Sequence, residues 1–165
     1  MDRLILLRHG KTEARAASGE DFDRELTARG RRDVALVTAA IRDAGYVADR
    51  ALVSAAARAQ QTWEVAAAAF PGATVETRAD LYDSSAGTLL AAGQTPLGRT
   101  VLIVAHNPGL QILAITLCAH AGAPSFEARL RAGLATGAAA VFAFQGETVE
   151  AKGLFYPADF GGGPD

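Results

Sequence analysis

The sequence predicts an α/β fold of three layers, in which a mostly parallel central sheet is covered by helices on both faces. Short apolar runs alternate with longer segments of helical pattern along the chain. The clearest runs, 4–7 and 100–105, consist almost entirely of apolar residues, as is typical of strands buried on both faces. With 165 residues, half of them hydrophobic, the chain has the size of one domain with one core.

The N-terminal elements follow from local patterns. We expect a strand at 3–8 and a polar loop at 9–25. A helix should then run from Thr27, whose hydroxyl can cap it, to about Ala44, with Gly45 as its stop.

The middle of the chain repeats this alternation. A second strand is expected at 51–54, followed by an alanine-rich helix that Ser54 can cap and that ends near 71–72. A third strand at 74–77 and a helix at about 84–92 come next.

The C-terminal elements complete the sheet. The run at 100–105 is the most apolar strand, and Pro108 stands where the next helix should begin. Segments 139–144 and 149–155 flank a glycine and predict a hairpin. We expect one domain over 1–160 and a flexible tail at 161–165.

Composition excludes several classes of function. The net charge is −2 and no basic stripe is visible, so a nucleic-acid partner is not expected. The single cysteine, Cys118, excludes an internal disulfide framework and suits a reducing compartment. No apolar run has the length of a membrane span or of a signal-peptide core, and we therefore expect a cytoplasmic protein without a membrane partner. The histidines lie on separate segments without ligand spacing, so neither a metal nor another cofactor is expected.

Polar residues follow three of the predicted strands. Arg8 and His9 end the first strand, and Arg58 lies one helical turn after the second. His106 directly follows the strand at 100–105. Because ligands bind beyond the carboxyl ends of parallel strands, these side chains should meet at one edge of the sheet. Each has a structural explanation alone (a loop, a solvated helix residue, a helix cap), but their coincidence at three strand ends favours a site.

This set of residue types suits a phosphate. Guanidinium groups bind phosphoryl oxygens in a bidentate manner, helix N-termini offer free N–H groups, and a neutral imidazole can act as a nucleophile. The sequence therefore predicts a phosphoryl site at this edge.

Four segments also carry a family resemblance. Residues 7–12, Leu-Arg-His-Gly-Lys-Thr, resemble the signature of the histidine phosphatase superfamily, whose fold is phosphoglycerate mutase-like. Segments 26–30, 54–62 and 104–109 are similar to its further blocks, in the same order. The short chain and the form His-Asn-Pro-Gly, together with the segment 82–85, look like the SixA branch, the phosphohistidine phosphatases.

The resemblance implies roles for individual residues. His9 would attack phosphorus and become phosphorylated, after which water hydrolyses the intermediate. Arg8 and Arg58 would clamp the phosphoryl oxygens, and His106 would donate a further hydrogen bond to them. Asn107 would add to substrate binding, and Lys11 and Thr12 would extend the pocket.

The proton donor to the leaving group is a separate question. An alkoxide needs an acid, and Asp83 is the candidate, because it follows Leu81-Tyr82 where acids of this family lie. Alternatively, Asp83 only caps the helix that begins near Ser84. An imidazole leaving group relaxes the need for an acid, which favours a phosphohistidine substrate.

The leading hypothesis is thus a monomeric phosphatase that acts on a histidine-phosphorylated phosphotransfer protein. The alternative is a phosphomonoesterase of small metabolites that uses the same residues. A phosphoglycerate mutase is less favoured, because mutases usually carry an Asn shortly after the first motif, where this chain has Glu13 and Ala14. A phosphate-binding module without catalysis is also less favoured, since both arginines and both histidines are retained.

Overall fold

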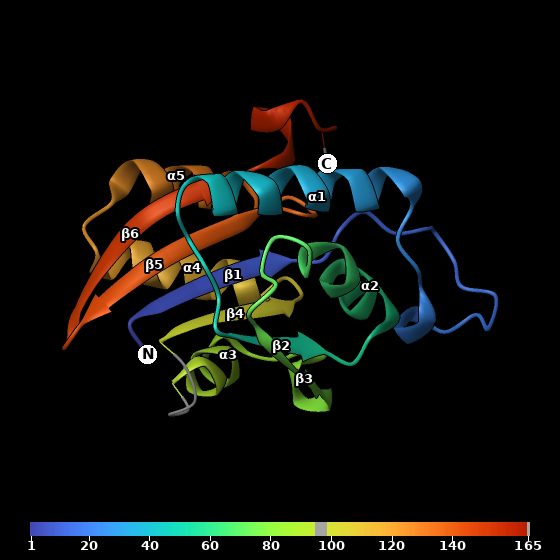
Figure 1. The fold of residues 1–165 in the computed structure, drawn as a ribbon, viewed down its shortest axis with the longest axis horizontal. Helices are drawn as coiled ribbons and strands as arrows, with labels where there is room; N and C mark the ends of the chain where they lie inside the picture. The colour runs from blue at the N-terminus through green and yellow to red at the C-terminus, as the bar shows by residue number, and fades with distance from the viewer. Residues whose placement is uncertain (95–98, 165) are drawn as a thin grey trace.

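The computed structural model describes residues 1–94 and 99–164. Within them the chain forms a six-stranded mixed sheet in the order β3-β2-β4-β1-β5-β6 (Figure 1). The strands are β1 (Arg3–Arg8), β2 (Arg50–Ser54), β3 (Thr74–Arg78), β4 (Thr100–Ala105), β5 (Ala139–Gln145) and β6 (Thr148–Phe155). The α-helices are α1 (Ala28–Asp43), α2 (Ala57–Ala66), α3 (Ala86–Gly93), α4 (Gly109–His120) and α5 (Pro124–Ala132). Three short 3-10 helices are η1 (Asp21–Asp23), η2 (Ala79–Leu81) and η3 (Pro157–Phe160).

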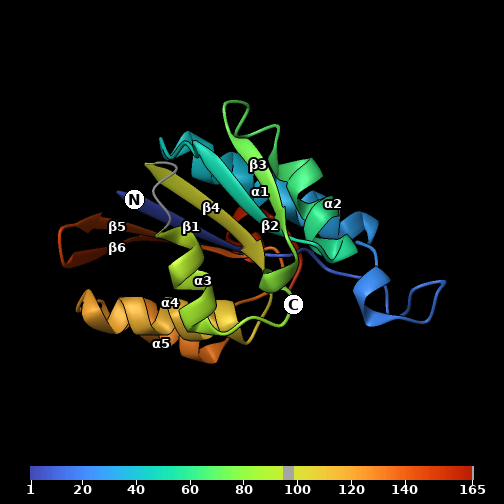
Figure 2. The ribbon, with the colours of Figure 1, turned by 90° about the horizontal axis from the view of Figure 1, so that it is seen from below.

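Helices cover both faces of the sheet, so the predicted three-layer α/β fold is confirmed. Helices α1 and α2 lie on one face, and α3, α4 and α5 lie on the other (Figure 2). In β1, Leu4 and Leu6 pack toward α3–α5, whereas Ile5 and Leu7 pack toward α1 and α2. Because successive side chains of a strand alternate between faces, an all-apolar strand supplies both cores at once.

The directions of the strands determine at which edge of the sheet the site lies. Strands β1 to β4 are mutually parallel, whereas β5 pairs antiparallel with both β1 and β6. The prediction of a mostly parallel sheet with a terminal hairpin is therefore confirmed. The carboxyl ends of the four parallel strands share one edge of the sheet.

Of the helix caps predicted for Thr27 and Ser54, only the first is present in the structure. The Thr27 hydroxyl accepts the Gly30 N–H, which confirms the predicted cap of α1. The prediction that Ser54 caps the next helix is wrong: α2 begins only after Ala56, and no side chain caps it. Ser54 ends β2, and its hydroxyl contacts His106 instead.

Helix α5 and the turn η1 were not foreseen in the sequence. Helix α5 buries only Leu130, so it shows almost no apolar periodicity. Turn η1 lies inside the segment expected to be a polar loop and buries no residue.

The C-terminal segment contacts α1. The backbone N–H of Gly163 donates to Asp33, 3.2 Å away. Position 165 of the tail expected at 161–165 lies outside the described residues. No helix in the described ranges combines the length and the apolar character needed to cross a bilayer.

Candidate active site

A cavity of about 350 Å³ opens at the shared carboxyl edge of the parallel strands. It is lined by residues from the end of β1, the following loop, the first turn of α2 and the segment before β5. These residues are Arg8, His9, Lys11, Thr12, Arg24, Arg58 and Thr136. The ring of His106, which follows β4, lies 5.1 Å from that of His9 between centroids. The structure therefore brings together the two arginines and two histidines that sequence reasoning selected, with Lys11 and Thr12 beside them.

His9 is held as a neutral imidazole, and one of its nitrogens has no hydrogen-bond partner in residues 1–94 and 99–164. Its Nδ1 lies 2.8 Å from the carbonyl oxygen of Gly10, which can only accept, so Nδ1 carries the proton. Burial lowers the pKa of His9 to about 3, and the positive charges of the neighbouring arginines act in the same direction. At neutral pH the Nε2 atom therefore bears a lone pair, as a nucleophile needs.

The loop that carries His9 is braced from α2. The backbone N–H of Gly10 donates to the Thr62 hydroxyl, 3.0 Å away, and that hydroxyl donates to the carbonyl of Arg58. The position of His9 is thus coupled to the helix turn that carries Arg58.

His106 is also neutral and has one nitrogen to offer. Its Nε2 lies 2.7 Å from the Ser54 hydroxyl, and its buried Nδ1 has no hydrogen-bond partner in the described part of the chain. Burial, followed by the charge of Arg58, lowers the pKa of His106 to about 4. If the Ser54 hydroxyl donates to Nε2, the ring proton lies on Nδ1, which is then a donor without an acceptor among the described residues.

The two arginines are anchored by different parts of the chain. Arg8 donates to the carbonyl of Leu134, 2.7 Å away. Arg58 is buried and donates both to the backbone carbonyl of Asp21, at 2.8 Å, and to its carboxylate, at 3.0 Å. Each guanidinium has five N–H groups, so the contacts of Arg58 with Asp21 leave donors for an oxyanion.

Asp21 ties several parts of the site together. Its carboxylate also accepts hydrogen bonds from the Tyr82 hydroxyl, at 2.9 Å, and from Arg24, at 3.0 Å. These two hydrogen bonds, that of Tyr82 first, lower the pKa of Asp21 to about 2. Asp21 is therefore an anion at neutral pH and has no proton to give.

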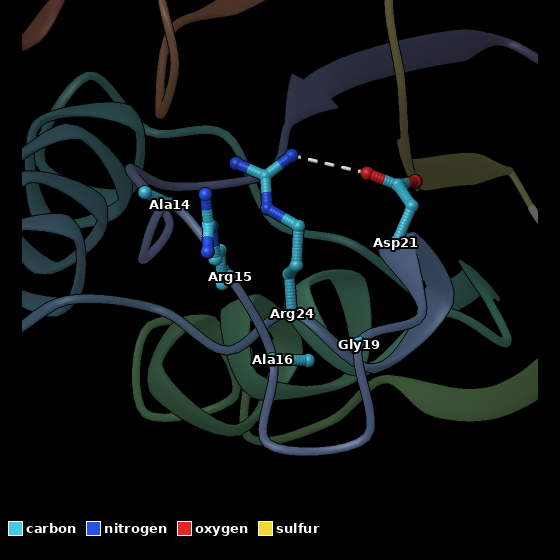
Figure 3. Close-up of a pocket in the computed structure, with 6 residues that line it drawn as sticks. All are labelled: Ala14, Arg15, Ala16, Gly19, Asp21 and Arg24. Atoms are coloured by element: carbon cyan, nitrogen blue, oxygen red, sulfur yellow. Dashed lines mark hydrogen bonds and ion pairs between the residues drawn. The ribbon is translucent and has the colours of Figure 1, made fainter.

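Arg24 adds a further cation to the cavity. It donates to the Thr12 hydroxyl at 2.6 Å and to the Glu13 carbonyl at 2.9 Å. It also lines a neighbouring hollow of about 480 Å³, where it reaches toward Asp21 (Figure 3). Arg24 thus forms part of the wall between the two hollows.

Two predicted site residues lie apart from this cavity. Asn107 donates its side-chain amide to the carbonyl of Leu134 and to Gln111, so it braces the chain near Arg8. Asp83 is exposed on the connection from η2 to α3, in a left-handed backbone conformation with φ of 51°. Its alternative role as a helix cap is wrong, because Ser85 caps α3. The role of Asp83 as an acid stays a prediction.

Sequence reasoning missed Asp21 and Arg24 and gave Tyr82 no role. The first two lie in a loop crowded with charged residues, where no periodicity distinguishes one acid or base from another. Among the described residues, no cluster of three potential metal ligands occurs.

Comparisons with known proteins identify the family of this chain. The family model of the histidine phosphatase superfamily (branch 1) matches residues 4–95. A search of curated proteins returns no match.

Solved structures similar to this chain include proteins assigned as the phosphohistidine phosphatase SixA. The one from Agrobacterium tumefaciens is 30% identical, with a TM-score of 0.81 over 94% of this chain and 98% of that one. The one from Nakamurella multipartitia is 26% identical, with a TM-score of 0.81 over 94% and 96% of the two chains. A SixA structure complexed with tungstate is 24% identical, with a TM-score of 0.74 over 95% and 98%, and it shares the fold.

The family model covers more than half of the chain and includes the segment with Arg8, His9 and Arg58. The chain therefore belongs to the histidine phosphatase superfamily, branch 1, and has its phosphoglycerate mutase-like fold.

Proposed function

We propose that this protein is a phosphohistidine phosphatase that removes the phosphoryl group from a histidine-phosphorylated phosphotransfer protein. The observation that supports this most is the state of His9. It is a buried neutral imidazole whose Nε2 has no hydrogen-bond partner among the described residues, in a cavity that also holds the guanidinium groups of Arg8 and Arg58.

In this proposal the reaction has two steps. The Nε2 atom of His9 attacks phosphorus, and the bond between phosphorus and the leaving nitrogen breaks with its electron pair moving to that nitrogen. Water then attacks the phosphorylated His9, which releases inorganic phosphate and regenerates the imidazole. Arg8, Arg58 and His106 stabilise the negative charge of the phosphoryl oxygens in both steps.

The nature of the leaving group follows from the acids near the cavity. None of the lining residues in the described part of the chain is a carboxylic acid. The nearby carboxylate of Asp21 is ionised, since its pKa is about 2. An imidazole that is already protonated on its second nitrogen leaves as a neutral ring and needs no acid from the enzyme, which favours phosphohistidine over an alkyl phosphate.

The proposal is tested by trapping the intermediate. Radiolabelled phosphoramidate or a phosphohistidine peptide should transfer acid-labile phosphate to the wild-type protein and to His120→Ala, an exposed histidine at the end of α4. His9→Ala should acquire no label and should lose turnover by a factor on the order of 1000 or more. Wild-type turnover in His9→Ala would disprove the mechanism, and a wild-type protein without label would indicate a binding module.

A second candidate is a phosphomonoesterase of small metabolites. The volume of about 350 Å³ and the four basic side chains at its wall suit a small phosphorylated molecule. Parallel turnover of a phosphohistidine peptide and of sugar and glycerate phosphates separates the two. A higher kcat/KM for a metabolite would favour the second candidate.

We also propose that the enzyme acts as a single-domain monomer in the cytoplasm. The lone buried cysteine suits a reducing compartment. Gel filtration with light scattering tests the monomer.

A further inference from the structure

Four aromatic rings lead in series from the nucleophile to the surface. The rings of His9 and His106 are 5.1 Å apart between centroids, and those of His106 and Tyr82 are 5.5 Å apart. Tyr82 in turn lies 5.1 Å from Phe22, edge to face, and 39% of the surface of Phe22 is exposed. These spacings are those of interacting aromatic pairs, and the exposed ring leaves room for one more.

The Tyr82 ring is fixed beside the groups that would hold the phosphoryl oxygens. Its hydroxyl donates to Asp21, which also accepts from Arg58. The guanidinium carbon of Arg58 lies 5.7 Å from the centre of the Tyr82 ring. Tyr82 therefore touches both Arg58 and His106, and a group attached to a phosphorus atom between these two residues lies beside it.

We propose that Tyr82 and Phe22 form the subsite for the leaving group and that they select a leaving group with an aromatic ring. The chemistry shared by such substrates is a phosphoryl group on an aromatic ring, either on an imidazole nitrogen or on a phenolic oxygen. This inference deepens the proposed function and rests on it, because His9 is the nucleophile in both.

The chemistry of the leaving group points the same way. When His9 attacks, the bond from phosphorus to the ring atom breaks and its electron pair stays on that atom. A protonated phosphoimidazole departs as neutral imidazole, and a phenyl ester departs as phenolate, which water then protonates. When the enzyme supplies no acid, both groups leave more readily than an alkoxide. No carboxylic acid is among the described residues that line the cavity.

The test uses three peptides of one sequence that carry phosphohistidine, phosphotyrosine or phosphoserine. Phe22→Ala should lower kcat/KM for the two aromatic substrates by about two- to tenfold, mainly through KM, and leave phosphoserine unchanged. Phe160→Ala is the matched control, because Phe160 is 38% exposed and lines a separate hollow on α1. Tyr82→Phe keeps the ring and should retain most of the preference, whereas Tyr82→Leu should lose it.

The three peptides also distinguish between the two kinds of aromatic leaving group. If Phe22→Ala lowers kcat/KM for only one of the two aromatic peptides, the result still supports the subsite and shows whether it binds an imidazole or a phenol ring. An equal loss on all three peptides, or no loss on either aromatic one, would overturn the proposal.

Inhibition by phosphonates tests binding at the subsite independently of turnover. Phenylphosphonate should inhibit the wild-type protein more strongly than methylphosphonate, and Phe22→Ala should reduce this difference by about two- to tenfold. Equal inhibition by the two phosphonates in the wild-type protein would also overturn the proposal. If instead the phosphonate preference is present but His9 never becomes phosphorylated, the proposed function fails and the subsite stands.

Discussion

The carboxylate of Asp21 accepts a hydrogen bond from the buried guanidinium of Arg58 at a distance of 3.0 Å. The side chain of Arg58 is 7% exposed, whereas that of Asp21 is 52% exposed, so a loop residue at the surface orients an arginine inside the site. The backbone carbonyl of Asp21 accepts from the same guanidinium at 2.8 Å. The loop between β1 and α1 therefore holds the guanidinium that we propose binds the phosphoryl oxygens.

Removal of this carboxylate should loosen Arg58. We expect Asp21→Ala to lower kcat on the order of tenfold, because a hydrogen bond to a charged partner that positions the guanidinium is lost. Asp21→Asn should be less affected, since its amide oxygen can still accept from Arg58. Steady-state kinetics check this, with Asp43→Ala, an exposed acid paired with Arg42, as the control. Faster turnover or tighter phosphate inhibition in Asp21→Ala would instead mean that the carboxylate competes with substrate.

The contact between Ser54 and His106 should matter for both stability and rate. Ser54→Ala leaves the buried Nε2 of His106 without its partner, so we expect unfolding to become easier by about 1–3 kcal/mol and kcat to fall. Ser18→Ala removes an exposed hydrogen bond to Asp23 and should change stability by less than about 0.5 kcal/mol. Urea unfolding measures both, and similar losses in the two variants would contradict the assigned role of Ser54.

The protonation of His9 can be observed directly. Nitrogen-detected NMR of the imidazole should show the proton on Nδ1 at pH 7, because Nδ1 faces the Gly10 carbonyl. The ring should stay neutral on acidification until pH approaches its pKa of about 3. A proton on Nε2, or titration near pH 6.5, would refute the neutral nucleophile.

The two buried histidines should make stability depend on pH. In the unfolded chain each imidazole binds a proton below about pH 6.5, whereas the folded chain binds none until about pH 4 for His106 and about pH 3 for His9. The unfolded state therefore binds more protons in this window, and stability falls as pH falls. The limiting slope is about 1.4 kcal/mol per pH unit for each histidine.

Urea unfolding between pH 7 and 4.5 measures this slope. The double variant His9→Gln/His106→Asn should show a flatter dependence over the same range. Asp21 does not interfere, because its pKa in the folded chain is about 2 and its unfolded value is 3.8. An unchanged slope in the double variant would show that other groups cause the dependence.

Close packing of α1 against the site loop should not tolerate a side chain at Gly30. A Cβ atom there would lie 2.2 Å from the backbone oxygen of Lys11. We expect Gly30→Ala to destabilise the fold by about 1–3 kcal/mol and to displace Lys11. Gly87→Ala in α3, where the new Cβ atom would lie 3.7 Å from the Ser85 hydroxyl oxygen, should instead stabilise by up to about 1 kcal/mol. Thermal unfolding compares the two, and equal effects would contradict this packing.

The local sequence was sufficient to predict those parts of the fold and of the site that depend on residues close together in the chain. Apolar runs determine where β1 and β4 lie, and a parallel sheet necessarily brings their ends to one edge. Arg8 could thus be placed because it ends a strand, and His9 and His106 because each directly follows one. Arg58 could be placed because it lies in the first turn of the helix after β2. Helix α5 could not be placed, since one buried leucine leaves no periodic pattern.

The tertiary structure alone decided which charged residues complete the site. Asp21 accepts hydrogen bonds from Arg58, 37 residues away in the sequence, and from Tyr82, 61 residues away. Nothing in the local sequence pattern of these segments encodes such contacts. They arise because the loop after β1 folds back over the carboxyl edge of the sheet. Sequence determined which histidines and arginines lie at the shared edge of the sheet, and the long-range contacts of the folded chain determined how Arg58 is oriented there.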